Sequence, residues 1–384
     1  MGKYLFIANG SKQGIEESLS KSKFELSNYI KVPAEIAKES GYEVYIGINK
    51  KYPELIECSM DVKFYNANIF RNIFDIKNNL IAYKNLMNIL KSEKIDVIHC
   101  NTPIGGVLGR LCGRKLNVPK IIYTAHGFHF YKGAPLLNQT LFKWIEMWMA
   151  HYTDALITIN QEDYQSAQKF KLRKEGKVYY VPGVGIDTSI ISKKKSKRKD
   201  LLNEIKAGND SILMISVGDL NKNKNNEVII KALGQVENTS VHYILCGLGD
   251  EKDKLISLAK ENNCEKNIHF LGYRSDIPEL LQSCDIFVMP SYREGLSRSI
   301  MEAMSAGLPC VVSKIRGNVD LIKDGKGGYV CQPDNIQEFA RAISVLISDS
   351  SLRSLMGKYN LKNVRKYDVE QIKLEIKKIY NEIL

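Results

Sequence analysis

Short apolar runs alternate with longer amphipathic stretches along almost the whole chain. The runs are continuous in Val, Ile, Leu and Tyr, as in KIIYTAH at 120–126 and DIFVMP at 285–290. Parallel strands that helices cover on both faces have this composition, whereas half-exposed strands alternate apolar and polar residues. The pattern therefore predicts an α/β protein built on parallel sheets.

The alternation occurs in two successive halves of the chain. A chain of 384 residues also exceeds one ordinary core and fits two domains of roughly 150–200 residues. In the first half we expect strands at 4–9, 43–48, 96–100, 120–126, 154–159 and 178–183, with helices near 24–40, 77–94, 104–117 and 137–152. In the second half we expect strands at 212–218, 241–247, 268–273, 285–290 and 309–313, with helices near 225–236, 251–262, 276–283, 298–306 and 335–348.

A basic run separates the two halves. KKKSKRK at 193–199 repels itself and follows a segment rich in Gly and Pro, so we expect a solvated linker there. A basic patch that touches a membrane is the alternative. The end of the chain has apolar residues on one helical face and predicts an amphipathic helix. The expected division is a first domain at 1–187 that also holds the helix at 367–384, a basic linker at 188–200 and a second domain at 201–366.

The composition of the chain bears on where in the cell the protein is expected. No apolar run approaches the roughly 20 residues that span a bilayer, and the start of the chain reads as a buried strand instead of a secretory signal. Eight cysteines occur without C-x-x-C spacing or a neighbouring histidine cluster, which indicates reduced thiols and no metal site. We therefore expect a cytoplasmic protein.

Charge points to a polyanionic partner. The formal net charge is +12, of which residues 1–187 carry +7. No nucleic-acid-binding motif accompanies this excess, so nucleic acid is not an expected partner. An anionic lipid surface together with a diphosphate ligand accounts for the charge.

The strongest chemical signal is a pair of glutamates after the strand at 285–290. Glu294 is expected in the turn before a helix, and Glu302 about one and a half turns into it. A helix N-terminus presents backbone amides to an anion, and a carboxylate can accept hydrogen bonds from ribose hydroxyls. This segment therefore predicts a site for a nucleotide diphosphate.

The glutamate segment, PSYREGLSRSIMEAMSAGLPCVVS, resembles the donor-site signature of the retaining glycosyltransferases of family 4, which have the GT-B fold. The resemblance covers nearly the whole chain, and the pair HGFHFYKGAP and VPGVGID is most similar to bacterial capsule and exopolysaccharide glycosyltransferases. It implies two Rossmann-like parallel-sheet domains with an interdomain cleft and a C-terminal helix that returns to the N-terminal domain. Further similar segments are YTAHGFHFYKG (123–133), VPGVGID (181–187), SVGDLNKNKN (216–225), CGLGDEKDKL (246–255) and FLGYRSDIPELLQSCDIFVMPS (270–291).

The resemblance also implies roles for individual residues. His126 and Glu294 match positions beside the reacting sugar and its hydroxyls, and we take them as catalytic. Asp219 stands where the family often has an arginine. The implied donor-binding residues are Gly218, Lys224 at the diphosphate, Arg274 near the nucleobase, the amides of Gly295, Leu296 and Ser297, and Glu302 at the ribose. Weaker assignments, to the acceptor or to the loop after the first strand, are Asn9, Gly10, His99 and Tyr131.

The expected reaction is transfer of a hexose or N-acetylhexosamine from a nucleotide sugar to a lipid-diphosphate-linked saccharide at the inner membrane face. UDP is the expected carrier and GDP the alternative. We expect no cofactor and no metal, because no Asp-x-Asp motif stands at a strand end. A nucleotide-sugar epimerase of the same fold, a transferase with a small soluble acceptor and a non-catalytic sugar-binding protein stay open, as does the oligomeric state.

Overall fold

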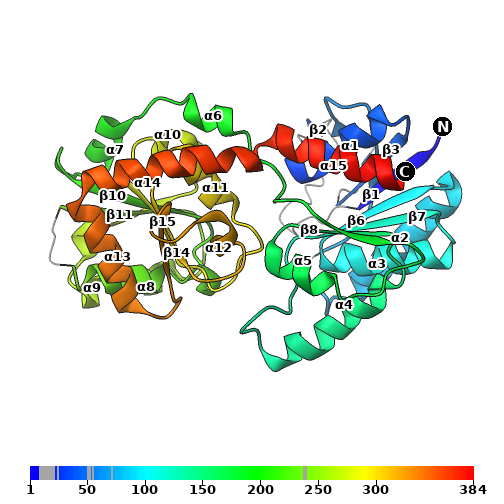
Figure 1. Ribbon diagram of the computed structural model, residues 1–384, viewed down its shortest axis with the longest axis horizontal. Helices are drawn as coiled ribbons and strands as arrows, with labels where there is room; N and C mark the ends of the chain where they lie inside the picture. The colour runs from blue at the N-terminus through cyan, green and yellow to red at the C-terminus, as the bar shows by residue number, and fades with distance from the viewer. Residues whose placement is uncertain (8–21, 24–25, 50–52, 54–55, 71, 237–239) are drawn as a thin grey trace. The chain divides into compact units, whose positions relative to one another are not determined.

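The chain folds into two compact units, each built on its own parallel sheet (Figure 1). The computed structural model describes residues 1–384 except 8–21, 24–25, 50–52, 54–55, 71 and 237–239. Unit 1 contains Met1–Gly185 and Glu370–Leu384, and unit 2 contains Ile186–Val369. The predicted class, α/β with two Rossmann-like domains, is therefore confirmed.

Unit 1 has a seven-stranded sheet in the order β5-β3-β1-β6-β7-β8-β9, and all neighbours are parallel. All five residues of β6 are buried, as expected for a central strand with helices on both faces. The strands are β1 (Lys3–Ile7), β3 (Glu43–Ile48), β5 (Lys63–Asn66), β6 (Val97–Asn101), β7 (Lys120–Ala125), β8 (Ala155–Thr158) and β9 (Lys177–Tyr180). A separate short pair joins β2 (Ser22–Lys23) to β4 (Ile56–Glu57).

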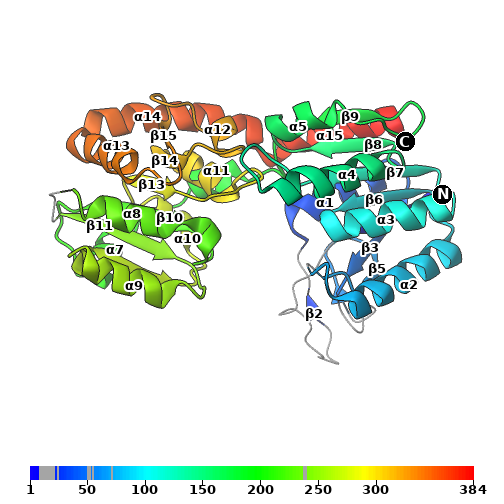
Figure 2. The same cartoon turned by 90° about the horizontal axis from the view of Figure 1, so that it is seen from below.

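Helices cover both faces of this sheet. Figure 2 shows α2, α3 and α4 side by side on one face, and α1 and α15 lie together on the other. The described helices of unit 1 are α1 (Asn28–Glu39), α2 (Ile76–Glu93), α3 (Pro103–Lys115), the π-helical turn η3 (Asn138–Phe142), α4 (Lys143–Ala150), α5 (Gln161–Ala167) and α15 (Val369–Ile383), whose first residue belongs to unit 2. The helix expected near 137–152 is thus a π turn followed by a short α-helix.

The C-terminal helix α15 packs on unit 1, as the resemblance implied. Its buried residues include Ile372, Ile376 and Tyr380. The Tyr380 hydroxyl lies 2.6 Å from the Tyr4 hydroxyl and 2.7 Å from Nδ1 of His99, so the helix is bonded directly to β1 and β6.

Unit 2 has a six-stranded parallel sheet in the order β12-β11-β10-β13-β14-β15. The strands are β10 (Ile212–Val217), β11 (Val241–Cys246), β12 (Ile268–Gly272), β13 (Ile286–Met289), β14 (Cys310–Ser313) and β15 (Gly328–Cys331). The helices are α6 (Thr188–Ser192), α7 (Arg198–Glu204), η4 (Lys222–Lys224), α8 (Asn226–Leu233), α9 (Lys252–Glu261), η5 (Glu265–Asn267), α10 (Ile277–Leu281), α11 (Arg298–Ser305), α12 (Asn318–Leu321), α13 (Ile336–Ser348), α14 (Ser350–Asn363) and η6 (Val364–Tyr367).

Several elements of this fold do not appear among the expected ones. The edge strands β5 and β15 are only four residues long and partly exposed, so their apolar signal is weak. Helix α14 has a mixed surface without a clear apolar stripe, and it was not expected either. All eight cysteines are free thiols, and seven of them are buried.

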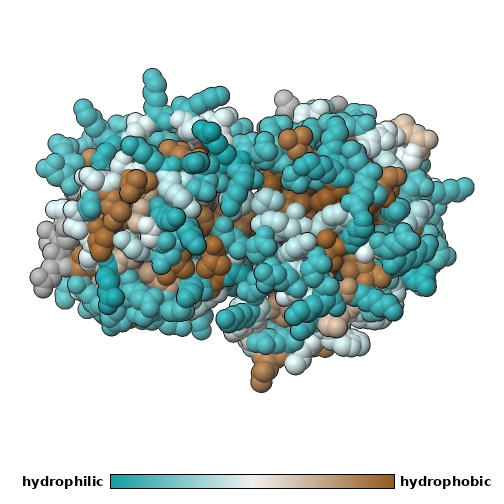
Figure 3. All heavy atoms as spheres, in the orientation of Figure 1, coloured by the Kyte–Doolittle hydropathy of each residue, from teal (hydrophilic) through white to brown (hydrophobic). Residues whose placement is uncertain are grey.

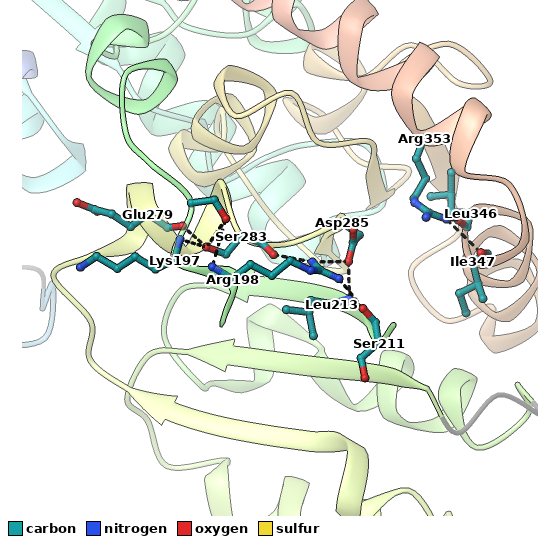
Figure 4. Close-up of polar contacts among 11 residues, drawn as sticks. Lys197, Arg198, Ser211, Leu213, Glu279, Ser283, Asp285, Leu346, Ile347 and Arg353 are labelled. Atoms are coloured by element: carbon teal, nitrogen blue, oxygen red, sulfur yellow. Dashed lines mark hydrogen bonds and ion pairs between the residues drawn. The ribbon is translucent and has the colours of Figure 1, made fainter. Parts of the chain in front are cut away.

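The basic segment between the halves is more ordered than a solvated linker. It contains α6 and the start of α7, and Ile191 is buried. The lysines at 193–195 are exposed, but Arg198 turns inward (Figure 4). Its guanidinium donates to the carbonyl oxygens of Ser283 (2.8 Å) and Ser211 (2.5 Å) and pairs with Asp285 Oδ2 at 2.9 Å.

The carboxylate that pairs with Arg198 links two strands, as Figure 4 also shows. Asp285 Oδ2 also accepts from the Leu213 amide at 2.8 Å, so one carboxylate joins the start of β10 to the start of β13. On α14, Arg353 donates to the carbonyl oxygens of Leu346 and Ile347 at the end of α13. Two partly buried arginines, Arg198 and Arg353, thus donate hydrogen bonds to carbonyl oxygens at the ends of helices and strands in unit 2.

We expect Arg198→Met to destabilise unit 2 by about 2–3 kcal/mol, because two carbonyl oxygens and a carboxylate lose a charged donor. Urea denaturation followed by circular dichroism measures the change in the free energy of unfolding. Lys199→Met is the matched control, because Lys199 is the exposed next residue of the same helix. Equal unfolding midpoints for the two variants would contradict the anchoring role of Arg198.

Candidate functional site

The two glutamates occupy the positions that the sequence predicted. Glu294 lies in the loop between β13 and α11, and Glu302 lies in the second turn of α11. Ser297 is the N-cap residue, and its hydroxyl accepts from the Ile300 amide at 3.4 Å. Because this loop follows β13 in an all-parallel sheet, it leaves the carboxyl edge of the sheet, where α/β proteins bind their ligands.

Lys224 and Glu294 form an ion pair at this edge. Lys224 Nζ lies 2.8 Å from Glu294 Oε1, and the two side chains are only 20% and 15% exposed. Lys224 ends the short turn after β10, the strand next to β13. Gly218 makes room for the lysine, because a Cβ at this glycine would lie 3.0 Å from Lys224 Cε.

Hydrogen bonds hold the two loops against each other. The Tyr292 amide donates to the Asn223 carbonyl at 2.8 Å, and the Asn223 side chain donates to the Arg293 carbonyl at 3.0 Å. Asn225 is buried in a left-handed conformation, and its side chain donates to the Pro290 carbonyl at 3.1 Å. The relative position of Lys224 and Glu294 is therefore set by backbone contacts as well as by their charges.

The start of α11 presents amides beside the ion pair. Within the described part of the chain, the backbone amides of Gly295, Leu296 and Ser297 have no hydrogen-bond acceptor. Leu296 packs against the core of unit 2 and Ser297 is buried, so the segment is fixed. Amides at a helix N-terminus, next to a lysine, form a site for an anion such as a diphosphate.

Arg316 and Gly317 support this segment from the loop after β14. Arg316 is buried, and its Nε donates to the Glu294 carbonyl at 3.4 Å. Gly317 has a φ of +77°, and a Cβ there would lie 2.3 Å from the Gly295 carbonyl oxygen. Neither residue was among the predicted site residues, although an Arg-Gly pair after a buried strand indicates a tight turn.

The remaining donor candidates have protein partners. Glu302 is 17% exposed and pairs with Arg298 Nε at 2.8 Å, whereas Arg298 itself is largely exposed. Arg274 makes two bonds to Asp276 at 2.8 Å and one to Glu204 at 2.7 Å, so its guanidinium is fixed at the end of β12. Asp219, in the position that the family often fills with arginine, is exposed.

Unit 1 contains a pocket lined by both candidate histidines. His126 follows β7, and its ring meets that of Tyr29 edge-on with centroids 5.9 Å apart. The hollow has about 380 Å³ of empty space, part of it open to solvent. Its polar lining residues are Asn28, Tyr29, His99, Asn101, Thr124 and His126, and the apolar ones include Ile157, Val181 and Ile376.

Aromatic packing holds the loop that follows His126. The amide of Phe128 donates to the buried Asp163 carboxylate at 2.9 Å. The rings of Phe128 and Phe130 stack at 4.7 Å and both contact Phe170. Alternate side chains of HGFHF are therefore buried, which fixes the backbone next to His126.

His99 is a bonded core residue that also borders the pocket. Its Nδ1 lies 2.8 Å from the Tyr4 hydroxyl, and its Nε2 lies 2.7 Å from Thr124 Oγ1. Burial, and to a smaller extent the charge of the neighbouring His126, lowers the pKa of His99 to about 3. His99 is therefore neutral at physiological pH and takes part in the attachment of α15.

Besides His99, Tyr131 is the weaker acceptor assignment that lies within the described part of the chain. Tyr131 is half-buried in the loop after β7, and its carbonyl accepts from the Ala134 amide at 2.9 Å. Asn9 and Gly10 lie outside the described residues. Within the described part of the chain, no group of three or more His, Cys, Asp or Glu residues could hold a metal ion, and no helix has the length and apolar character needed to cross a bilayer.

Comparison with known proteins identifies the class. Residues 24–160 match the family model described as "Glycosyl transferase 4-like", and residues 197–363 match "Glycosyl transferases group 1". EpsD of Bacillus subtilis, which is named as a glycosyltransferase, is 33% identical over 356 residues, 90% of each chain. An Escherichia coli protein named UDP-Gal:alpha-D-GlcNAc-diphosphoundecaprenol alpha-1,3-galactosyltransferase is 31% identical over 301 residues, 77% of each chain.

Solved structures agree on the fold. Anabaena HepE, crystallised with UDP and glucose, superposes with a TM-score of 0.78 over 100% of both chains at 20% identity. Sucrose-phosphate synthase from Thermosynechococcus elongatus gives 0.80 at 17% identity, over 100% of this chain and 99% of that one. The molecule is thus a glycosyltransferase with the GT-B fold. It belongs to the group 1 glycosyltransferases, family 4, as the sequence indicated.

We expect Gly317→Ala to lower the affinity for UDP by about tenfold or more, equivalent to about 1.4 kcal/mol, because its Cβ displaces the Gly295 carbonyl and the amides beside it. Isothermal titration calorimetry measures the affinity. Gly325→Ala is the matched control, since Gly325 also has a positive φ (+69°) but no atom lies within 4 Å of its Cβ position. If both variants bound UDP equally well, the segment 295–297 would not be part of the nucleotide site.

Proposed function

We propose that this glycosyltransferase is a retaining enzyme that moves a hexose or N-acetylhexosamine from a UDP-sugar to a lipid-diphosphate-linked saccharide. The product would be an intermediate in the assembly of a capsule or exopolysaccharide. The observation that carries this proposal is the half-buried Lys224–Glu294 pair beside the amides of 295–297. That arrangement combines charge for a diphosphate with an acceptor for sugar hydroxyls.

The donor would bind through complementary charges in unit 2. The diphosphate would take Lys224 and the helix amides, while the Glu302 carboxylate accepts hydrogen bonds from the ribose. Arg298 can leave Glu302 at little cost, since the arginine is largely exposed and an i,i+4 ion pair on a helix contributes only about 0.3–0.5 kcal/mol. Glu294, held by Lys224 and anchored through its carbonyl by Arg316, would accept from the hydroxyls of the transferred sugar.

The transfer step follows from this placement of charge. The acceptor hydroxyl oxygen bonds to the anomeric carbon as the bond from that carbon to the diphosphate oxygen breaks. The acceptor proton passes to the departing diphosphate, on the same face of the sugar, so the configuration is retained. Lys224 and the amides stabilise the negative charge that develops on the leaving group. We propose that no metal ion is required, because these groups supply the positive charge.

Named relatives support the acceptor class. The E. coli relative is named for transfer from UDP-Gal to a GlcNAc-diphosphoundecaprenol. A Campylobacter jejuni protein, 36% identical over 143 residues, is named for transfer to a diphospho-undecaprenol-linked sugar. We propose that the pocket of unit 1 contributes to acceptor binding, that His126 acts in catalysis, and that the protein works in the cytoplasm at the inner face of the plasma membrane.

A transfer assay tests the proposal. Purified enzyme, a panel of UDP-sugars and GDP-mannose, and a saccharide-diphosphate-undecaprenol acceptor are combined with EDTA, and UDP release is measured. We expect release that depends on the acceptor, and NMR of the product should show the donor's anomeric configuration. His126→Ala should lower turnover by about 10²-fold or more without weakening UDP binding, within the range for a group that acts in the transition state.

Other outcomes would contradict the proposal. An inverted product would reject retention, and activity that EDTA abolishes would reject metal independence. Conversion of the UDP-sugar without an acceptor would indicate an epimerase. UDP release with small soluble acceptors but not with the lipid-linked one would reject the acceptor class.

A further inference from the structure

A group of large apolar side chains is exposed on the segment that leads into α4 and along α4 itself. Scattered exposed apolar residues are ordinary, but a contiguous group of this size marks an interaction surface. Positions 137, 141, 144 and 148 follow helical spacing and share one face. The members, with their exposed fractions, are Leu136 (81%), Leu137 (61%), Leu141 (45%), Trp144 (62%), Met147 (40%) and Trp148 (43%).

The opposite face of α4 is fixed to the core. Arg110 on α3 is 1% exposed and pairs with Glu146 on α4 at 2.9 Å. The Arg110 guanidinium also lies over the ring of Tyr123 at 3.9 Å, and Met149 is buried. Breaking a buried ion pair is costly, so α4 cannot turn to bury its tryptophans. The rings of Trp144 and Trp148 stack on the outside with centroids 5.9 Å apart.

A second apolar group lies at the start of α2. Helices α2, α3 and α4 are neighbours on one face of the sheet (Figure 2). Because α2 leads into β6 and α4 leads into β8, both helices begin at the carboxyl edge of the same parallel sheet. The exposed residues of this second group are Ile73 (49%), Phe74 (83%), Ile76 (71%), Leu80 (56%) and Ile81 (38%). We call the two groups together the α2–α4 surface.

The α2–α4 surface lies in a basic part of the chain. Residues 71–151 contain eleven Lys and Arg against four Asp and Glu, an excess equal to that of residues 1–187 as a whole. Lys77, Lys84 and Lys143 are exposed on α2 and α4. Of the acidic residues, Glu146 is paired with Arg110 and Asp75 accepts from the Asn78 amide as the N-cap of α2. Figure 3 shows hydrophobic side chains projecting at the lower edge of the unit, where Figure 1 places α4.

We propose that the α2–α4 surface docks unit 1 on an anionic phospholipid bilayer, an inference that rests on the proposed lipid-linked acceptor. Tryptophan, leucine and phenylalanine enter the headgroup region, and lysines around them attract anionic headgroups. A second copy of the chain is a poorer occupant, since two identical basic surfaces repel each other. The docking places unit 1 at the interface where a lipid-anchored sugar is presented.

The chain carries its own probe for this contact. Trp144 and Trp148 are its only tryptophans, so all tryptophan fluorescence comes from the α2–α4 surface. We expect vesicles of equal parts phosphatidylcholine and phosphatidylglycerol to shift the emission to shorter wavelength and to reduce quenching by acrylamide. Pure phosphatidylcholine vesicles should produce a smaller change, and added salt should weaken the response to the mixed vesicles.

Co-sedimentation with the mixed vesicles tests whether the two tryptophans contribute to membrane binding. Trp144→Ser with Trp148→Ser should weaken binding by about tenfold or more, because two interfacial anchors are lost. Leu355→Ser with Leu374→Ser is the matched control, since both leucines are exposed helix residues outside the surface (66% and 52%). Circular dichroism checks that both variants are folded.

Three results would overturn the proposal. The first is equal vesicle binding by the tryptophan variant and the control. The second is a tryptophan emission shift that depends on protein concentration without vesicles, which would assign the surface to a second copy. The third is an unchanged emission in the presence of mixed vesicles.

Activity separates this inference from the proposed function. With a water-soluble short-chain acceptor, the tryptophan variant should release UDP at the wild-type rate, whereas its rate on a vesicle-embedded acceptor should fall. Vesicle binding by a wild-type protein that transfers sugar to neither acceptor would reject the proposed function and leave the docking surface standing.

Discussion

The contact between two loops at the carboxyl edge of the second sheet sets the geometry of the proposed diphosphate site. The turn after β10 and the loop after β13 join through backbone and asparagine hydrogen bonds, and Lys224 meets Glu294 across the join. Neighbouring parallel strands bring together residues 70 positions apart, with opposite charges and a helix N-terminus in one place. Without this contact, the lysine would be a solvated side chain on a surface turn.

In unit 1, parallel strands likewise bring side chains together at the carboxyl edge of the sheet. β6 ends near His99 and Asn101, and β7 ends near Thr124 and His126, so parallel pairing gathers these side chains around one pocket. The C-terminal helix contributes Ile376 to the wall and bonds His99 through Tyr380. The last residues of the chain therefore help to shape a pocket whose other walls come from its first half.

The sequence predicted the main elements because parallel strands buried on both faces produce continuous apolar runs. β3 matched to the residue, and Glu294 and Glu302 took their expected places because a strand, a glycine and a helix start follow one another closely in the chain. Residues that act through long-range contacts were harder to find. Arg316 and Asn225 donate hydrogen bonds to backbone carbonyl oxygens of another loop at the site. The sequence around each of them does not indicate these partners.

The pattern of charged residues predicted local structure less well than the pattern of apolar residues did. The basic run at 193–199 suggested a solvated linker, but one member, Arg198, ties three backbone or carboxylate groups together inside unit 2. A local count of lysines and arginines does not show which of them faces inward. Exposed apolar positions such as Trp144 are similarly ambiguous in sequence, because the same helical spacing describes a buried face.

Calorimetry of UDP binding to Lys224→Met tests the central claim most directly, with Lys222→Met as the control. Lys222 belongs to the same turn but is exposed, whereas Lys224 is paired with Glu294. The structure predicts that Lys224→Met weakens binding by about tenfold or more, as loss of a charged hydrogen bond of about 1.5–3 kcal/mol requires, while Lys222→Met binds like the wild type. Equal affinities for the two variants would contradict a diphosphate site at the Lys224–Glu294 contact.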